Sequence, residues 1–142
     1  MTENPLLLER QLCFPLYACS RAVIKAYHPF LMKLGLTYTQ YLVMMGLWSE
    51  KRIQVKALGS QLYLDSGTLT PLLKKLETKK FLARERCAED ERVLFVRLTE
   101  QGEELRKQAV DIPLQMRRCL SVSKTETETL YQLLYSILHT LK

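Results

Sequence analysis

The run LDSGTLTPLLKKLE at residues 64–77 constrains the fold more than any other segment. Leu69, Leu72, Leu73 and Leu76 recur at i, i+3, i+4 and i+7, which predicts a helix, regular from about Thr70, with an apolar stripe facing inward. We place the start there because Pro71 is unfavourable inside a helix. The opposite side is polar and carries Ser66, Thr68, Thr70, Lys74 and Lys75. These side chains suit a major groove, where hydroxyls reach base edges or phosphates and lysines hold the backbone, although an ordinary solvated face has the same composition.

A β-hairpin is expected directly after this helix. Residues 81–87 and 93–98 show strand-like alternation, and residues 88–92 join them. At the tip, Asp90 stands two residues before Arg92, so its carboxylate can hold the guanidinium for entry into a minor groove. Taken alone, this pair favours the other interpretation, a surface turn with a weak ion pair. Arg86, on the first strand, completes the predicted DNA contacts.

The order of the elements decides between these alternatives. A helix at about 39–50 and a short helix containing Val55, Leu58 and Leu62 precede the polar helix, and the hairpin follows it. This order predicts a winged helix-turn-helix over residues 39–99. The fold class is therefore mainly α with a small β-hairpin, in a single domain of 142 residues.

Long helices are expected at both ends of the chain. Asn4 and Pro5 open the first, predicted to run to about Leu34 and to be bent by Pro15, and Pro113 should break or kink the long helix that begins near Thr99. Ser123 to Glu126 is a capping box for a final helix. The apolar stripe of that helix consists of Leu130, Leu134, Ile137, Leu138 and Leu141. We expect residues 1–38 and 100–142 to form a dimerisation region, so that a homodimer presents two recognition helices to a pseudo-palindromic operator in double-stranded DNA.

Composition limits the possible partners and location. The formal charge of +6 favours polyanions, and the chain shows neither an apolar run long enough to cross a bilayer nor a cleavable leader, so we expect a cytoplasmic protein without membrane contact. Four cysteines in such a chain are typical of reduced or redox-sensing thiols. No paired CxxC occurs and the histidines are limited to His28 and His139, so we expect no metal and no cofactor.

Cys13 lies among phenols on one predicted helix. Tyr17, four residues on, falls beside it and can donate its hydroxyl to a thiolate. Tyr27 returns to the same angular position about 21 Å further along the axis, so it cannot touch its own Cys13. In an antiparallel pair of these helices, each Tyr27 approaches the Cys13 of the partner subunit. The other interpretation is a core helix with an aromatic stripe and an inert thiol.

The segments LCFPLYACSR, LTYTQYLVM, LYLDSGTLTPLLKKLE and DERVLFVRLTEQG, in this order, resemble the MarR family of dimeric winged-helix repressors, and more narrowly its OhrR-type sensors of organic hydroperoxides. The resemblance covers nearly the whole chain. It implies that Cys13 is the peroxidatic cysteine, that Tyr17, Tyr27 and Tyr38 are its pocket phenols, and that Phe14 and Leu16 favour an organic peroxide. The protein is then a repressor, not an enzyme, released from its operator when an organic hydroperoxide oxidises Cys13.

The resemblance also implies a fate for the oxidised sulfur. Cys119 lies close to the position of the resolving thiol in two-cysteine OhrR-type proteins, which predicts a disulfide to Cys13 of the partner subunit. Capping of a single oxidised Cys13 by a small thiol is the alternative. Cys19 lies about 240° around the helix from Cys13 and cannot join it without unfolding, and Cys87 falls in a wing strand, as a buried small residue.

Two other functions remain open at this point. A MarR-type repressor with the same fold can respond to a small phenolic ligand. A thiol peroxidase would use Cys13 catalytically with a reductant, but the sequence has no thioredoxin-like strand-helix motif and no histidine beside the cysteine to donate a proton.

Overall fold

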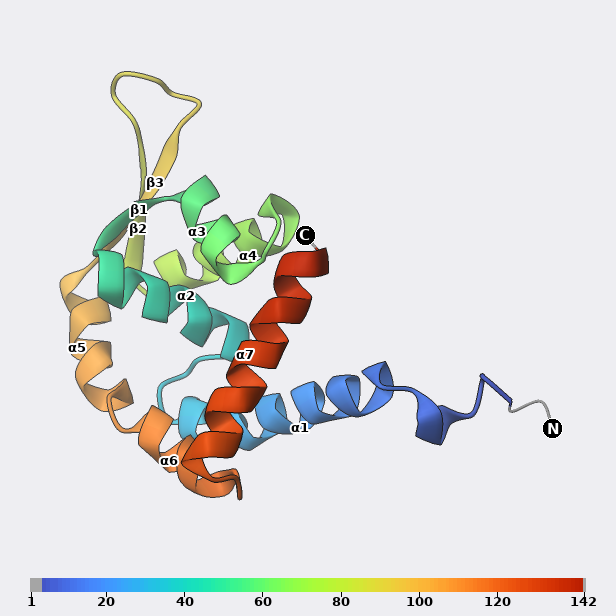
Figure 1. The fold of residues 1–142 in the computed structure, drawn as a ribbon. Coiled ribbons are helices and arrows are strands. Elements are labelled where there is room, and N and C mark those ends of the chain that lie inside the picture. Colours follow the sequence, from blue (N-terminus) through green and yellow to red (C-terminus); the bar gives the residue numbers. More distant parts are fainter. Residues whose placement is uncertain (1–3, 142) are drawn as a thin grey trace. The chain divides into compact units, whose positions relative to one another are not determined.

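The computed structural model describes residues 4–141, which divide into two compact units, one up to Ile112 and one from Pro113 (Figure 1). The first unit contains, in chain order, the 3-10 helix η1 (Leu8–Arg10), α1 (Cys13–Met32), α2 (Tyr38–Glu50), β1 (Arg52–Gln54), α3 (Val55–Leu62), α4 (Ser66–Thr78), β2 (Leu82–Arg86), β3 (Leu94–Leu98) and α5 (Glu100–Ala109). The α6 helix (Ile112–Cys119) begins at the boundary, and α7 (Lys124–Leu141) lies in the second unit.

The core of the first unit is built around α2. Val43, Met44 and Leu47 on this helix are fully buried. Around them lie the other fully buried side chains of the winged-helix elements: Leu58, Leu69, Leu73, Leu76, Leu82 and Val96. The predicted inward stripe of α4 is thus confirmed, with Leu72 half-buried at its edge. Close packing brings α2 against α3, where a Cβ on Gly46 would stand 2.8 Å from Leu58 Cδ1.

The predicted hairpin is confirmed, and a third strand joins it. The sheet is antiparallel in the order β1-β3-β2, with Ile53 opposite Val96 and Arg84 opposite Val96 on the other side. Sequence reasoning missed β1 because three residues are too short to show an alternating pattern. Figure 1 shows the β2–β3 loop projecting away from the helices of the first unit.

The α4 helix begins four residues earlier than predicted, at Ser66. Asp65 accounts for this start, because its Oδ1 accepts a hydrogen bond from the backbone N–H of Thr68 at 2.7 Å. Pro71 therefore lies inside the helix and leaves the carbonyl of Gly67 without its usual donor. Both residues are exposed, so water can take the place of the missing N–H.

The first long helix begins later than predicted. Asn4 accepts a hydrogen bond from the backbone of Leu6 in a turn, and Gln11 Nε2 donates to the carbonyls of Pro5 and Leu7 at 2.7 and 2.9 Å. These contacts accompany a turn and the 3-10 helix η1, so the segment before α1 is not part of the α-helix. The predicted bend at Pro15 is therefore wrong: α1 starts at Cys13, which puts Pro15 in the first turn, where proline needs no N–H partner.

Four short corners connect the elements of the first unit. Gly35, Lys51, Tyr63 and Lys80 have φ values of 69°, 66°, 57° and 68°, in the left-handed region. Lys79 Nζ donates to the carbonyl of Gly35 and to Gln40 Oε1, the latter at 3.4 Å. The end of α4 is thereby joined to the corner between α1 and α2.

The last part of the chain differs from the prediction in detail. The predicted break in this helix is present, but it lies just before Pro113: α5 ends at Ala109 and α6 begins at Ile112, so Pro113 stands in the first turn of α6. The capping box at α7 is confirmed: Glu126 N donates to Ser123 Oγ at 3.1 Å and Ser123 N to Glu126 Oε1 at 2.9 Å. Cys119 is the last residue of α6 and is exposed. Among residues 4–141, no helix combines the length and the apolar character that a membrane span needs.

Candidate functional site

Cys13 is the first residue of α1 and its side chain is exposed. Within residues 4–141, no other cysteine forms a disulfide with it, since all four thiols are free. Phe14 and Leu16 beside it are also exposed, at 43% and 41%. An apolar, accessible surface therefore surrounds a reachable sulfur atom.

Tyr17 lies one turn beyond Cys13 and pairs with Arg21. Its hydroxyl oxygen accepts a hydrogen bond from Arg21 Nη1 at 3.0 Å, and the guanidinium carbon stands 5.7 Å from the ring centroid. Because Arg21 uses the acceptor side of the oxygen, the phenolic hydrogen of Tyr17 is left available to donate.

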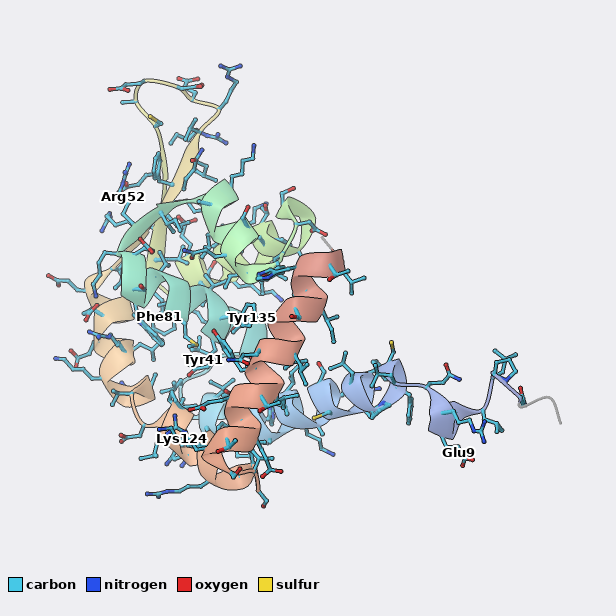
Figure 2. All side chains as sticks on the ribbon, viewed as in Figure 1. Glu9, Tyr41, Arg52, Phe81, Lys124 and Tyr135 are labelled. Carbon is cyan, nitrogen blue, oxygen red and sulfur yellow. The ribbon has the colours of Figure 1, made fainter. Side chains whose placement is uncertain are left out.

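Tyr27 and Tyr38, the other two predicted phenols, are brought together by the contact between α1 and α2. Their ring centroids are 4.9 Å apart. Sequence reasoning did not include Tyr41 among these phenols, yet its ring centroid lies 5.8 Å from that of Tyr27 and 6.3 Å from that of Tyr38. Figure 2 shows Tyr41 among the helices of the first unit, and it is 2% exposed. The spacing of Tyr38 and Tyr41 on one helix face was the signal that could have found this cluster.

Burial keeps these phenols protonated. It raises the pKa of Tyr27 and of Tyr38 above the ordinary value of 10.0, with Tyr38 adding to the effect on Tyr27. Burial first, and then the two neighbouring tyrosines, raise the pKa of Tyr41 to about 12. At neutral pH the hydroxyls of Tyr27 and Tyr38 are thus donors, which is the form that stabilises a thiolate or a peroxide oxygen.

The second group of predicted residues gathers on α4 and the β2–β3 loop. On α4, Ser66, Thr68, Lys74 and Lys75 are exposed and Thr70 is half-buried. Exposed hydroxyls therefore lie toward the amino end of α4 and exposed lysines further along, with the exposed Pro71 between them.

The loop tip carries the predicted pair in the expected geometry. Arg92 donates to Asp90 from Nε at 3.1 Å and from Nη2 at 3.3 Å, and its backbone N–H donates to the same carboxylate at 3.0 Å. These hydrogen bonds hold the pKa of Asp90 below its usual value. The side chain of Arg92 nevertheless remains 91% exposed, so the guanidinium is fixed and open at once. Arg86 Nη1 donates to the Glu91 carbonyl at 2.9 Å, across the loop.

Two carboxylates that sequence reasoning missed hold the strands that carry this loop. Glu77 on α4 accepts from the backbone N–H and from Nε of Arg84 on β2, at 2.9 and 3.1 Å. Glu85 on β2 accepts from Arg97 at 2.6 Å and from Arg52 at 3.2 Å, so one carboxylate spans all three strands. Figure 2 shows Arg52 beside these strands.

No set of three metal-binding side chains occurs in the described part of the chain, and the chemistry available is that of a thiol, phenols and cations. The two predicted groups lie on different elements of the first unit. Cys119 belongs to the second unit, so its pairing with Cys13 stays a prediction.

Comparisons with known proteins place this architecture in a family. Residues 25–109 match the family described as transcriptional regulator SarA/Rot. The chain belongs to this family of regulators. It is 50% identical over 137 residues to the organic hydroperoxide resistance transcriptional regulator of Bacillus subtilis, covering 94% of this chain and 91% of that protein.

Solved structures agree with the assignment. Reduced AbfR bound to DNA, a Staphylococcus epidermidis protein, has a TM-score of 0.80 and 36% identity, over 95% of this chain and 94% of that one. The disulfide form of AbfR has a TM-score of 0.71 and 33% identity, over 95% and 93% of the two chains. The resemblance to MarR-type winged-helix regulators, and to their organic-hydroperoxide sensors, is confirmed.

Proposed function

We propose that this protein is a homodimeric, cytoplasmic repressor that releases its DNA operator when an organic hydroperoxide oxidises Cys13. The observation that carries this proposal is an exposed thiol at the start of α1 in a chain that also presents the α4 face and a fixed, open arginine at the loop tip. In a two-fold dimer, residues 39–99 of each subunit contact one half-site, and residues 1–38 and 100–142 form the dimerisation region.

The chemistry of the switch follows from the residues at hand. The Cys13 thiolate attacks the distal oxygen of the peroxide, so that an S–O bond forms and the O–O bond breaks. The alkoxide leaves and takes up a proton to become the alcohol. Sulfur loses two electrons and the peroxide gains them, giving a sulfenic acid. Tyr17 on the same helix, and Tyr27 and Tyr38 of the partner subunit, donate hydrogen bonds to the sulfur or the peroxide.

The oxidised sulfur is then resolved by a second thiol. In the preferred route, the Cys119 thiol of the partner subunit attacks the sulfenic sulfur, water leaves, and a disulfide forms. Oxidation occurs once per binding event and not in turnover, so the protein is not an enzyme. Whether Cys13 forms this disulfide or is capped by a small thiol, its contacts with the phenols change. The spacing of the two recognition helices changes with them.

On DNA, the two groups of side chains act differently. Ser66, Thr68 and Thr70 reach base edges or phosphates of the major groove, while Lys74 and Lys75 hold the backbone. Arg92, held by Asp90, enters the adjacent minor groove, and Arg86 lies along the wing toward the phosphates.

The decisive experiment compares DNA binding before and after cumene hydroperoxide, using a duplex that spans the region upstream of the protein's own gene. We expect native protein to lose binding on oxidation and Cys13→Ser to retain it. Cys19→Ser is the matched control, because Cys19 is another exposed thiol on α1, and it should behave as native. Equal loss in native protein and Cys13→Ser removes Cys13 from the mechanism.

The resolving step is tested separately by non-reducing electrophoresis. Oxidised native protein should run as a covalent dimer, and Cys119→Ser should stay monomeric under denaturing conditions. A covalent dimer that persists in Cys119→Ser contradicts the assignment of this thiol. Stoichiometric consumption of peroxide, rather than continued turnover with added thiol, separates the sensor from a thiol peroxidase.

A further inference from the structure

The sensing phenols are packed against a residue that no peroxide can reach. Tyr41 is 2% exposed, and its ring contacts both Tyr27 and Tyr38. Because protein interiors are close-packed, a displacement of either phenol has to be taken up by Tyr41 or by the helix that carries it. The hydroxyl groups of Tyr27 and Tyr38 are the groups whose contacts change when Cys13 is oxidised in the proposed function.

Tyr41 is connected in turn to Trp48, two turns further along α2. The two rings meet edge to face, with centroids 6.3 Å apart and an interplanar angle of 68°. Trp48 Nε1 donates a hydrogen bond of 2.8 Å to the carbonyl of Gly102 on α5, 54 residues away in the chain. This bond is the polar link by which the indole holds α2 to α5.

Gly102 stands at the base of the wing. A Cβ at this position would lie 2.2 Å from the carbonyl oxygen of Phe81, directly before β2. Thr99, which caps α5, donates its hydroxyl to the Lys80 carbonyl at 2.6 Å, and Leu98 N, at the end of β3, donates to the Lys51 carbonyl at 2.7 Å. The amino end of α5 therefore cannot move without moving the ends of both wing strands.

These contacts form one continuous series, which runs from the phenols through Tyr41, Trp48 and Gly102 to the ends of the wing strands. The geometry points to Tyr41 and Trp48 as positioning residues that transmit Cys13 oxidation from the sensing phenols to the DNA-binding wing. This inference rests on the proposed function and assigns the route by which its two groups of residues communicate. The ring contact of Tyr41 and the indole N–H of Trp48 are the two elements of the route.

The chain provides its own reporter, since Trp48 is its single tryptophan. Indole emission depends on the surroundings of the ring, so oxidation of Cys13 should shift the Trp48 emission of native protein. Cys13→Ser, treated in the same way, should show no shift. An unchanged emission in native protein that has released its DNA overturns the route while leaving the sensor intact.

Variants then test the two elements of the route. Trp48→Phe keeps an aromatic ring and removes the N–H donor, and Tyr41→Leu keeps an apolar side chain and removes the ring. Tyr41→Phe is the matched control, because it retains the ring and loses only the hydroxyl. Oxidation of Cys13 is measured directly in each variant: a dimedone probe traps the sulfenic acid, and mass spectrometry of the intact protein quantifies the adduct.

At equal oxidation of Cys13 by cumene hydroperoxide, native protein and Tyr41→Phe should lose at least about 20-fold in affinity for the upstream duplex, within the usual range of allosteric coupling. Trp48→Phe and Tyr41→Leu should lose less than about threefold. A purely structural role would lower the affinity of the reduced variants and leave the ratio between reduced and oxidised forms unchanged, which overturns the inference. Retention of DNA by fully oxidised native protein overturns both the route and the proposed function.

Thermal melting followed by circular dichroism shows whether each variant is folded at the temperature of the binding assay. If Trp48→Phe unfolds at the assay temperature, Tyr41→Leu and the emission of native protein still decide the question. Native-like emission shifts in Tyr41→Leu on oxidation contradict the role of the ring contact.

Discussion

The winged-helix elements and α7 use their apolar residues in opposite ways. In the winged-helix elements, Leu47, Leu58 and Val96 are fully buried within a single chain. In α7, Leu130, Tyr131 and Leu133 are 50%, 62% and 58% exposed, and Leu134 is the only half-buried residue of that helix among those described. The winged helix can thus form its core alone, whereas α7 presents an exposed apolar stripe, which we propose is covered by a second subunit.

The largest effect is expected in α7, at the proposed dimer interface. Leu134→Asp places a charge in the stripe and should weaken dimerisation at least about 100-fold, because an unpaired charge in an apolar interface costs several kcal/mol. Sedimentation velocity measures the dimer, and circular dichroism shows whether the helices remain. Gln132→Asp, outside the stripe, is the matched control. An unchanged dimer in Leu134→Asp would mean that α7 is not the interface.

The next prediction compares one substitution in both regions. Leu47→Ala should lower the free energy of unfolding by about 2–5 kcal/mol, since it leaves a cavity in a closed core. Leu133→Ala, made in the monomeric Leu134→Asp background, should change it by less than about 0.5 kcal/mol. Urea titration measures both. Similar losses for the two variants would contradict the contrast between the regions.

A smaller effect is expected at the base of the wing. Gly102→Ala brings a Cβ within 2.2 Å of a backbone carbonyl, which is unable to move aside cheaply, and should cost about 1–3 kcal/mol. Gly67→Ala is the matched control, because Gly67 also lies in the first turn of a helix and the nearest atom to its Cβ stands at 3.4 Å. Thermal melting of both variants checks the difference, and equal melting temperatures would show that α5 is not clamped there.

The smallest effect concerns pH. Hydrogen bonds from Arg97 and then Arg52 lower the pKa of Glu85 below its ordinary value of 4.5. A lowered pKa in the folded state means that the contribution to stability is present above pH 4.5 and is lost as the pH falls through the lowered value. Glu85→Gln should therefore melt at a lower temperature than native protein at pH 7, with a difference that shrinks toward pH 3. Glu89→Gln, at the wing tip, serves as control, and a difference independent of pH would contradict this account.

Local patterns could be predicted from the sequence, whereas contacts between distant residues could not. The stripe of α4 and the capping box of α7 are local patterns, so their residues indicate their structure directly. The contacts of Glu77 with Arg84 and of Trp48 with Gly102 join residues 7 and 54 positions apart, and no spacing rule reveals them. Tyr27 was singled out by its helical spacing from Cys13 and Tyr38 by the resemblance, whereas the contacts of Tyr41 depend on the packing of α1 on α2.

The predicted starts of two helices were wrong for a related reason. Pro15 and Pro71 were assigned their general effects on a helix, but Gln11 and Asp65 determine where α1 and α4 begin. At α4, the hydrogen bond that Asp65 accepts thus outweighs the unfavourable propensity of Pro71 inside a helix, whereas Pro15 is compatible with the first turn of α1. β1 shows the same limit, because three residues become a strand only when β3 lies beside them.

The left-handed corners at Lys51, Tyr63 and Lys80 carry a consequence for how DNA is released. Non-glycine residues rarely adopt this region, so each corner holds its two elements at a defined angle, and we expect a displacement passed on by Tyr41 and Trp48 to tilt the winged helix while its elements stay folded. The grooves of duplex DNA repeat about every 34 Å. Two winged helices therefore bind both half-sites only while the spacing between their recognition helices matches that repeat. We expect a small tilt of each winged helix to move its recognition helix out of register with the groove, so that both half-site contacts are lost together while the winged helices stay folded.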